Sequence, residues 1–306
     1  MMTITPDIKQ MGIKAKQASR KLAAASTESK NDCLRLIAEN LRLRKGEILT
    51  ANQIDINAAR SAKQKEHIIE RMVLNETRIN DMINACRDIA VLEDPIGKIL
   101  ESRSLANGIS LERIRVPLGV LGVIYESRPN VTIDITALCL KSGNSVILRG
   151  GKEAFQTNSI LADIVISTLE SQSLPVDSVQ FVSSTKRSLV KKMLGLEDYI
   201  DLIIPRGSAE LVKFVGENAL MPAVTGGVGV CHTYVDESAN LEKAIDIIIN
   251  AKVQRPTVCN ALDTVLVHEN IADRLLPILA KQFNINKVEM RGDSQTLKII
   301  GRENKI

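Results

Sequence analysis

The sequence predicts an α/β protein with a doubly wound, Rossmann-type parallel sheet, and three features of the chain lead to this fold class. Residues 8–92 show helical periodicity, residues 98–116 form two alternating runs around Asn107-Gly108, and from residue 118 short apolar strands alternate with helices. Strand followed by helix, repeated along a chain, is typical of a parallel sheet with helices on both faces. We therefore expect a helical N-terminus, a β-hairpin arm and then the sheet.

The helical period of residues 8–92 is carried by two sets of apolar positions: Leu34, Ile37 and Leu41, and Ile79, Met82, Ile83, Cys86 and Ile89. These stripes predict that Cys33 and Cys86 belong to the core. Asp94-Pro95 ends the helical region, because proline interrupts a helix.

A β-hairpin is expected next, over residues 98–116, because Asn-Gly between two alternating runs is a strong hairpin signal. A charged two-stranded ribbon between two domains is often an arm that pairs with another subunit. The alternative is a surface flap without a partner.

Apolar runs from residue 118 onward predict the strands of the sheet and the helices between them. We expect strands at 120–125, 145–150, 179–184, 201–206, 230–236 and 263–268, and helices near 131–142, 156–170, 185–195, 208–218, 240–252 and 271–283. Ligands of such sheets bind beyond the carboxyl ends of the strands, so the loops that follow each strand are the place to look for a site.

The overall composition of the 306 residues excludes several classes of protein. Hydrophobic residues make up 44% and aromatic residues 2%, so the core must consist of aliphatic side chains. The 40 basic and 36 acidic residues include no long basic block, which argues against nucleic acid as the main partner. The five cysteines are widely spaced without a CxxC, so neither a disulfide framework nor a metal site is predicted. No apolar run reaches a membrane span of about 18 residues, and we expect a cytoplasmic protein.

The loop after the first strand, residues 126–132, contains two candidate functional residues. Arg128 is a candidate anion contact. Asn130 lies where a helix begins, so its side chain could cap that helix or donate a hydrogen bond to a developing oxyanion.

Glycines and cations in two further loops suit a nucleotide. Gly150 and Gly151 allow close approach of the backbone, and Arg149 and Lys152 flank them with positive charge. The turn Arg206-Gly207-Ser208 opens a helix whose N-terminal amides could face an anion. The usual GxGxxG and Walker patterns are absent from the sequence.

Two cysteines lie near the C-terminal end of the sequence. Gly226, Gly227 and Gly229 precede a strand with Cys231 and His232, both of which are expected to be structural. Cys259 instead follows Pro256, with Lys252 and Arg255 upstream, and these cations would favour its thiolate. Its surroundings alone leave a nucleophile and an inert small residue equally open.

In this order the loops make the chain resemble the aldehyde dehydrogenase superfamily. The segments that carry the resemblance are "ERIRVPLGVLGVIYESRPNVT", "LCLKSGNSVILRGGKEAFQTN", "DLIIPRGSAELV", "PAVTGGVGVCHTYVDE" and "NAKVQRPTVCN". The resemblance implies an aldehyde dehydrogenase-like fold with four parts. They are a helical part of the cofactor domain (1–97), an oligomerisation arm (98–116), an NADP-binding domain (117–229) and an incomplete catalytic domain (230–306).

The resemblance also implies roles for individual residues. Cys259 matches the nucleophile and Asn130 the asparagine that holds the oxyanion. Cofactor contacts are expected from Arg149, Gly150, Gly151 and Lys152 at the ribose and its 2′-phosphate, and from Gly207, Ser208, Gly226 and Gly227 near the pyrophosphate and nicotinamide. We expect Arg128, Lys252 and Arg255 to hold the phosphate and carboxylate of the substrate.

The reaction that the resemblance implies is NADPH-dependent reduction of L-glutamyl 5-phosphate to L-glutamate 5-semialdehyde, in proline biosynthesis, through a Cys259 thioester. Hydrolytic members carry a glutamate base where this chain has Val224, and a reductase gains nothing from activating water against its thioester. A homo-oligomer and a glutamate 5-kinase as channelling partner are also implied.

The length of the chain keeps two alternatives open. The family is normally longer by roughly a hundred residues, and its C-terminal segments, including a His-rich signature and a loop that returns to the cofactor, are expected to be missing. The chain could therefore be a truncated, inactive fragment that retains a nucleotide-binding module. It could also be a reductase of another acyl phosphate or acyl-CoA.

Overall fold

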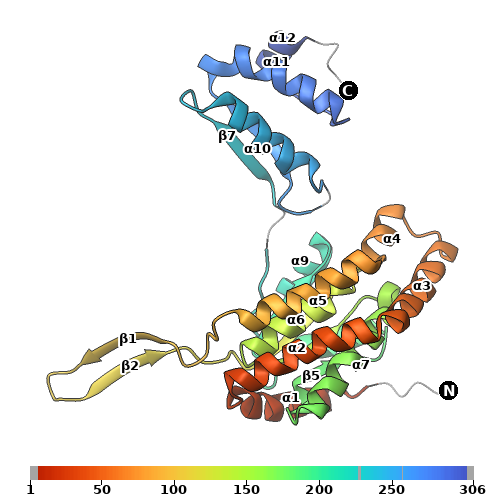
Figure 1. Cartoon of the computed structure of the whole chain (residues 1–306), viewed down its shortest axis with the longest axis vertical. Helices are drawn as coiled ribbons and strands as arrows, with labels where there is room; N and C mark the ends of the chain where they lie inside the picture. Colours follow the sequence, from red (N-terminus) through yellow and green to blue (C-terminus); the bar gives the residue numbers. More distant parts are fainter. Residues whose placement is uncertain (1–5, 227–228, 257, 302–306) are drawn as a thin grey trace. The chain divides into compact units, whose positions relative to one another are not determined.

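The structure is a computed structural model that describes residues 6–226, 229–256 and 258–301. The chain divides into two compact units, Met1–Gly226 and Gly227–Ile306 (Figure 1). Each unit has its own hydrophobic core. Among the described residues, no helix combines the length and apolarity that crossing a bilayer requires.

The first unit opens with the predicted helices, which are α1 (Ile8–Ala23), α2 (Thr27–Leu43), α3 (Lys45–Ser61), α4 (Glu66–Met72) and α5 (Glu76–Val91). Asp7, Ser26 and Asn75 cap α1, α2 and α5 by accepting hydrogen bonds from N–H groups of the first turn. The apolar stripes of α2 and α5 are buried against each other, and Cys33 and Cys86 lie among them, which confirms their prediction as core residues.

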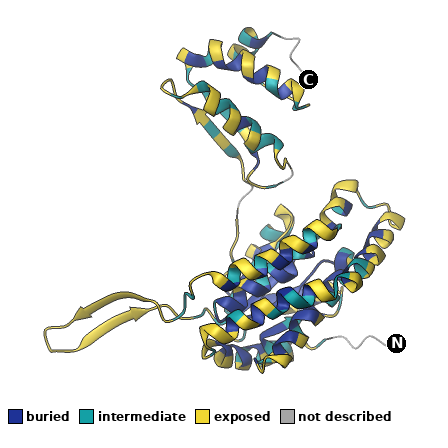
Figure 2. Ribbon diagram, viewed as in Figure 1, coloured by how far each residue is buried: buried dark blue, intermediate teal, exposed yellow. Residues whose placement is uncertain are grey.

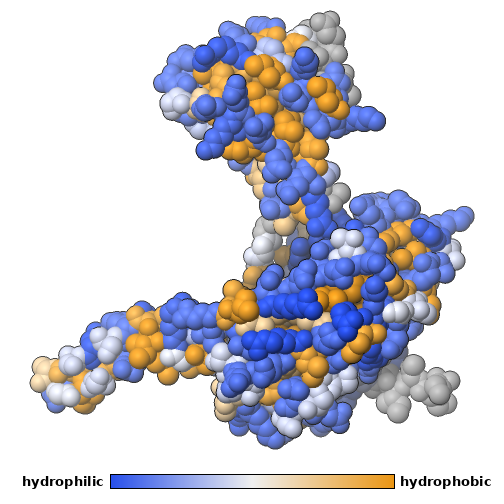
Figure 3. Space-filling model, in the orientation of Figure 1, coloured by the Kyte–Doolittle hydropathy of each residue, from blue (hydrophilic) through white to orange (hydrophobic). Residues whose placement is uncertain are grey.

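The hairpin is present as β1 (Ile99–Ser104) and β2 (Ser110–Ile114), paired antiparallel. Gly108 has a φ of 83°, and its N–H donates to the Leu105 carbonyl, which gives a three-residue loop. Every residue of both strands is exposed (Figure 2), and hydrophobic and hydrophilic residues are interspersed along the ribbon (Figure 3). An isolated hairpin of this kind gains little stability from its own packing.

A four-stranded parallel sheet in the order β5-β4-β3-β6 forms the centre of the first unit within the described residues. Its strands are β3 (Val120–Tyr125), β4 (Ser145–Arg149), β5 (Val179–Phe181) and β6 (Leu202–Arg206), and the helices between and after them are α6 (Asn130–Lys141), α7 (Phe155–Ser171), α8 (Ser188–Leu194) and α9 (Ala209–Asn218), with the short 3₁₀ turns η1 (Lys152–Ala154) and η2 (Val176–Ser178).

Both faces of the sheet are covered by helices, as a doubly wound fold requires. Leu121 and Val123 of β3 pack into the cluster formed with α2, α5, α6 and α7, whereas Val120 and Ile124 pack with α1 and α8 on the other face. All of β3 is buried, which explains its continuous apolar sequence. The predicted fold class is therefore confirmed.

One predicted strand is shorter than its apolar run. The run at 179–184 predicts six strand residues, but β5 ends at Phe181. The Ser184 N–H donates back to the Val182 carbonyl at 2.7 Å, and this tight turn ends the strand.

The second unit is built around a parallel pair, β7 (Cys231–Val235) and β8 (Leu262–Val267), joined by α10 (Leu241–Val253). Helices α11 (Glu269–Ile285) and α12 (Ser294–Ile300) follow. Ile248 of α10, Leu262 of β8 and Leu275 and Leu279 of α11 form its core.

Candidate functional site

The candidate residues of the first unit lie in loops at the carboxyl edge of the sheet, after β3, β4 and β6. Parallel strands bring these loops to one edge, which is where ligands of doubly wound folds bind. In the second unit, Lys252 lies in the last turn of α10, and Arg255 and Cys259 lie between α10 and β8.

The loop between β3 and α6 is held in a strained conformation. Ser127 has a φ of 45°, in the region that non-glycine residues rarely adopt. Its N–H and its hydroxyl both donate to Oε1 of Glu153, each at 2.9 Å. Glu153 thus fixes the loop that carries Arg128 and leads into Asn130, and both of these residues are half-buried.

Asn130 is the first residue of α6 and does not cap the helix. The N-cap position belongs to Pro129, which makes no side-chain cap hydrogen bond, so the capping alternative for Asn130 is wrong. The Asn130 Nδ2 donates to Oδ2 of Asp134, one turn later, at 2.7 Å. Burial raises the pKa of Asp134, and the hydrogen bond from Asn130 opposes that rise.

A buried polar network lies behind the loop after β4. The Tyr125 hydroxyl and the Thr132 hydroxyl are 2.7 Å apart, and Thr132 donates to the Asn158 carbonyl oxygen at 3.1 Å. A side chain on Gly150 would collide with the Asn158 amide, so the backbone can pass here only as glycine. The network ties the first turn of α6 to α7.

The two cations of this loop have different surroundings. Arg149 is buried, and its guanidinium donates to the carbonyls of Gly150 and Thr185, both at 3.0 Å. Lys152 is exposed, and its ammonium has no hydrogen-bond or ion-pair partner within the described ranges. Lys152, next to the Gly150-Gly151 backbone, is therefore a cation that can meet a phosphate.

The turn before α9 already holds a carboxylate. The Ser208 hydroxyl caps α9 by accepting from the Leu211 N–H, and the Ser208 N–H donates to Oε2 of Glu126 at 2.8 Å. A side chain on Gly207 would meet the same carboxylate. Glu126 thus sits at the helix N-terminus where the sequence predicts an anionic ligand.

The glycines after β6 lie at the limit of the first unit. Ala223 forms a parallel bridge with Ile203 of β6, so this segment continues the edge of the sheet. Val224 is 54% exposed. Gly226 is exposed, and Gly227 falls outside the described residues.

Cys259 lies in an exposed turn of the second unit. The Val258 N–H donates to the Arg255 carbonyl and the Ala261 N–H to the Val258 carbonyl, which shapes the turn. The Cys259 carbonyl accepts from the thiol of half-buried Cys231 at 3.5 Å, so its backbone packs against the start of β7 while its own thiol stays accessible. His232 hydrogen bonds through Nδ1 to the Val230 carbonyl.

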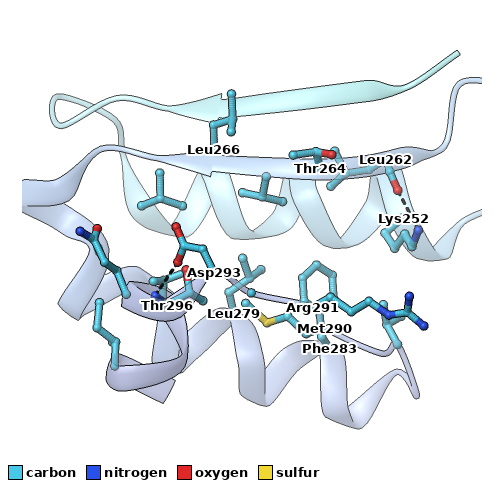
Figure 4. Close-up of a pocket in the computed structure, with 18 of the residues that line it drawn as sticks. Lys252, Leu262, Thr264, Leu266, Leu279, Phe283, Met290, Arg291, Asp293 and Thr296 are labelled. Atoms are coloured by element: carbon cyan, nitrogen blue, oxygen red, sulfur yellow. Dashed lines mark hydrogen bonds between the residues drawn. The ribbon is translucent and has the colours of Figure 1, made fainter. Parts of the chain in front are cut away.

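The two cations near Cys259 differ as well. The Lys252 ammonium donates to the Leu262 carbonyl at 2.8 Å and lines a cavity of about 660 Å³ that β8, α11 and the segment before α12 enclose (Figure 4). Arg255 is exposed, and its guanidinium has no partner among the residues that the structure describes. Lys252 is thus partly engaged by the fold, whereas Arg255 is available to a ligand.

The acidic residues that organise these loops are not predictable from the sequence pattern of strands and helices. Glu126, Asp134 and Glu153 each accept a hydrogen bond from a candidate residue or its loop. The spacing of Asn130 and Asp134, one helical turn apart, is the signal that could have found that pair. The other two pairings join separate loops and leave no mark in the sequence.

Comparisons with known proteins show which family the chain is similar to. Residues 4–298 match the aldehyde dehydrogenase family. The chain is 48% identical over 294 residues to a gamma-glutamyl phosphate reductase of Vibrio atlanticus, which covers 96% of this chain and 70% of that protein.

Solved structures give the same result. The crystal structure of gamma-glutamyl phosphate reductase from Thermotoga maritima superposes with a TM-score of 0.91 at 43% identity, over 97% of this chain and 72% of that one. The crystal structure of gamma-glutamyl phosphate reductase from Saccharomyces cerevisiae superposes with a TM-score of 0.68 at 31% identity, over 99% of this chain and 77% of that one. The chain therefore spans about 70% of the length of the Vibrio relative.

Proposed function

The chain belongs to the aldehyde dehydrogenase family, and from this membership we propose that it reduces L-glutamyl 5-phosphate to L-glutamate 5-semialdehyde and phosphate, the second step of proline biosynthesis from glutamate. The observation that carries this proposal is the 48% identity to a gamma-glutamyl phosphate reductase over 96% of the chain. The exposed thiol of Cys259 and the amide of Asn130 at the start of α6 supply the two groups that the reaction needs.

Cys259 acts as the nucleophile in the proposed mechanism. Its thiolate attacks the acyl carbon, the C–O bond to phosphate breaks, and phosphate leaves with the electron pair, so that a thioester remains. The Asn130 amide and the Cys259 backbone N–H stabilise the oxyanion of each tetrahedral intermediate. After reduction, the thiohemiacetal collapses to the aldehyde and returns the thiolate.

Enzymes of this family use nicotinamide cofactors, and we assign NADPH to this chain. When bound, NADPH supplies the hydride that reduces the thioester. Lys152 suits the 2′-phosphate because its ammonium is exposed at the carboxyl edge of the sheet, next to Gly150 and Gly151. Arg149 supports this loop from beneath through its carbonyl contacts. Gly207, Ser208, Gly226 and Gly227 are assigned to the pyrophosphate and nicotinamide end.

The substrate carries a phosphate and a carboxylate, and fixed cations are needed for both. We assign Arg128, Lys252 and Arg255 to them. Arg255 is the strongest of these candidates in the second unit because it is exposed beside the Cys259 turn.

We also propose a role for each part of the chain and a partner for the protein. Residues 1–97 and 117–229 form the cofactor domain, residues 230–306 carry the nucleophile, and residues 98–116 pair with another copy in a homo-oligomer. A glutamate 5-kinase that passes on the labile acyl phosphate is the expected partner. The free cysteines suit the reducing cytoplasm.

The test is phosphate-dependent reduction of NADP by glutamate 5-semialdehyde, measured for the 306-residue chain, Cys259→Ala and Cys231→Ala. We expect Cys259→Ala to lose more than about 10³-fold in kcat, because removal of a nucleophile abolishes the covalent route. Cys231→Ala removes a neighbouring thiol and should keep most of the activity. Turnover that survives in Cys259→Ala rules the mechanism out.

The cofactor assignment has a separate test. Lys152→Ala should raise KM for NADPH by about 10-fold or more, since a charge-assisted hydrogen bond to phosphate contributes about 1.5–3 kcal/mol. KM for NADH, which lacks the 2′-phosphate, should stay the same. An equal effect on both cofactors would contradict the role of Lys152.

A further inference from the structure

Asp134 is a half-buried carboxylate. It lies on α6 beside α5, where its neighbour is the buried thiol of Cys86. Such carboxylates are usually neutralised by a cation or by several N–H groups, because loss of water disfavours their charge. In the described part of the chain, the donor that meets Asp134 is the side-chain amide of Asn130, at 2.7 Å.

This contact restricts how Asn130 can present its amide. An ionised carboxylate only accepts hydrogen bonds, so Asn130 must turn its NH₂ group, and not its carbonyl oxygen, toward Asp134. The amide nitrogen carries two hydrogens, and Asp134 takes one of them. The second has no acceptor among the described residues and remains available to a ligand.

An unrestrained asparagine could flip and present its carbonyl oxygen to the substrate instead. That oxygen would repel an oxyanion, whereas a fixed N–H stabilises it without reorganisation during the reaction. A carboxylate one helical turn away is well placed to select the productive orientation. Burial raises the pKa of Asp134, and the hydrogen bond from Asn130 opposes that rise.

We propose that Asp134 is the positioning residue of Asn130: it holds the carboxamide with one N–H directed to the acyl oxygen of the reacting substrate. The inference rests on the proposed function, because it assigns a partner to the oxyanion donor of that reaction. Asp134 itself does not touch the substrate.

A double-mutant cycle tests the proposal. Asn130→Ala should lower kcat by about 10²-fold, the usual cost of losing an oxyanion donor. Asp134→Ala should cause a part of that loss, about 10-fold in kcat. KM should stay unchanged in both variants. Because Asp134 acts through Asn130, the double variant should be no worse than Asn130→Ala. Asp134→Glu should recover part of the activity. Asp163→Ala, which removes a surface carboxylate paired with Arg44 on the same unit, is the matched control.

Two physical measurements accompany the kinetics and do not need turnover. The side-chain amide signals of Asn130 in an NMR spectrum, identified by their loss in Asn130→Ala, should move in Asp134→Ala and stay in Asp163→Ala. The melting temperature of Asp134→Ala should equal or exceed that of the unmodified chain, whereas loss of a structural residue would lower it.

The outcomes separate this inference from the proposed function. Three outcomes would overturn the positioning role alone. They are full activity in Asp134→Ala with loss in Asn130→Ala, additive losses of activity in the double variant, and Asn130 amide signals that do not move in Asp134→Ala. Full activity in Asn130→Ala would overturn the oxyanion assignment and the inference with it.

Discussion

At the scale of single residues, the cysteines differ in what surrounds each thiol. Burial raises the pKa of Cys33, Cys86 and Cys139 to about 12 in each case, so these thiols are protonated and inaccessible at neutral pH. Cys231 is half-buried and donates to a carbonyl, and Cys259 is exposed. Reactivity toward an added reagent should follow this order.

This order can be measured by alkylation with iodoacetamide at pH 8, followed by peptide mass spectrometry. We expect Cys259 to be modified first, Cys231 more slowly, and the three buried cysteines only in denaturant. Modification of Cys33, Cys86 or Cys139 in the folded protein before Cys259 would contradict the structure.

Some of the candidate residues can be picked out from the sequence, whereas their partners in the folded chain cannot, and the reason is physical. Asn130, Lys152 and Cys259 follow apolar runs, and a pattern of strands and helices is enough to find such positions. The partners Glu126 and Glu153 come from different loops, and their contacts depend on how the strands are ordered in the sheet. Pairings of this kind arise only when the chain is folded.

At the scale of elements, buried carboxylates join the helices and make stability depend on pH. Asp55 of α3 accepts from the N–H groups of Gln156 and Thr157 at the start of α7, and burial raises its pKa despite these bonds. Asp94, after α5, is partly buried as well, but hydrogen bonds from Lys30, Ile96 and Thr27 outweigh burial and lower its pKa.

These opposite shifts predict opposite pH dependences. Because the pKa of Asp55 is raised in the folded state, its contribution to the free energy of unfolding is fully present below its pKa in the unfolded chain, about 3.9. This contribution is lost as pH rises through the pKa of the folded state. The contribution of Asp94 is present above about 3.9 and is lost as pH falls through its lower folded value.

Urea midpoints of Asp55→Asn and Asp94→Asn, measured from pH 3 to pH 7, check the two signs. Relative to the unmodified chain, Asp55→Asn should become more stable as pH rises, and Asp94→Asn less stable. If the urea midpoints of both variants, relative to the unmodified chain, changed in the same direction with pH, the opposite pKa shifts of Asp55 and Asp94 would be wrong.

Local signals predicted most elements well, since their causes are local. The hairpin follows from Asn107-Gly108 and β3 from a continuous apolar run, and both appear where expected. The end of β5 was not predictable, because Val182 and Ser184 read as strand residues while the backbone turns back between them.

At the scale of the whole molecule, the hairpin is the part of the first unit that its own core does not need. Every residue of its strands is exposed, and the Arg115 N–H donates to the Lys98 carbonyl at 3.0 Å, so the two ends of the arm are already joined. Replacing residues 99–114 by a Gly-Gly link should leave the circular dichroism spectrum and melting temperature nearly unchanged.

If the arm pairs with another copy, this replacement should reduce the molar mass measured by light scattering, and Leu111→Glu should have the same direction of effect. If the number of chains per particle, obtained from the molar mass, stays the same in both variants, the arm is a surface flap.

Trapping of the thioester shows whether Cys259 carries the acyl group. The chain is mixed with L-glutamyl 5-phosphate in the absence of NADPH, quenched in acid, digested and analysed by mass spectrometry. We predict a glutamyl adduct on the peptide that contains Cys259, removable by hydroxylamine and absent from Cys259→Ala. An adduct on another residue, or an adduct that persists in Cys259→Ala, would show that Cys259 does not carry the acyl group.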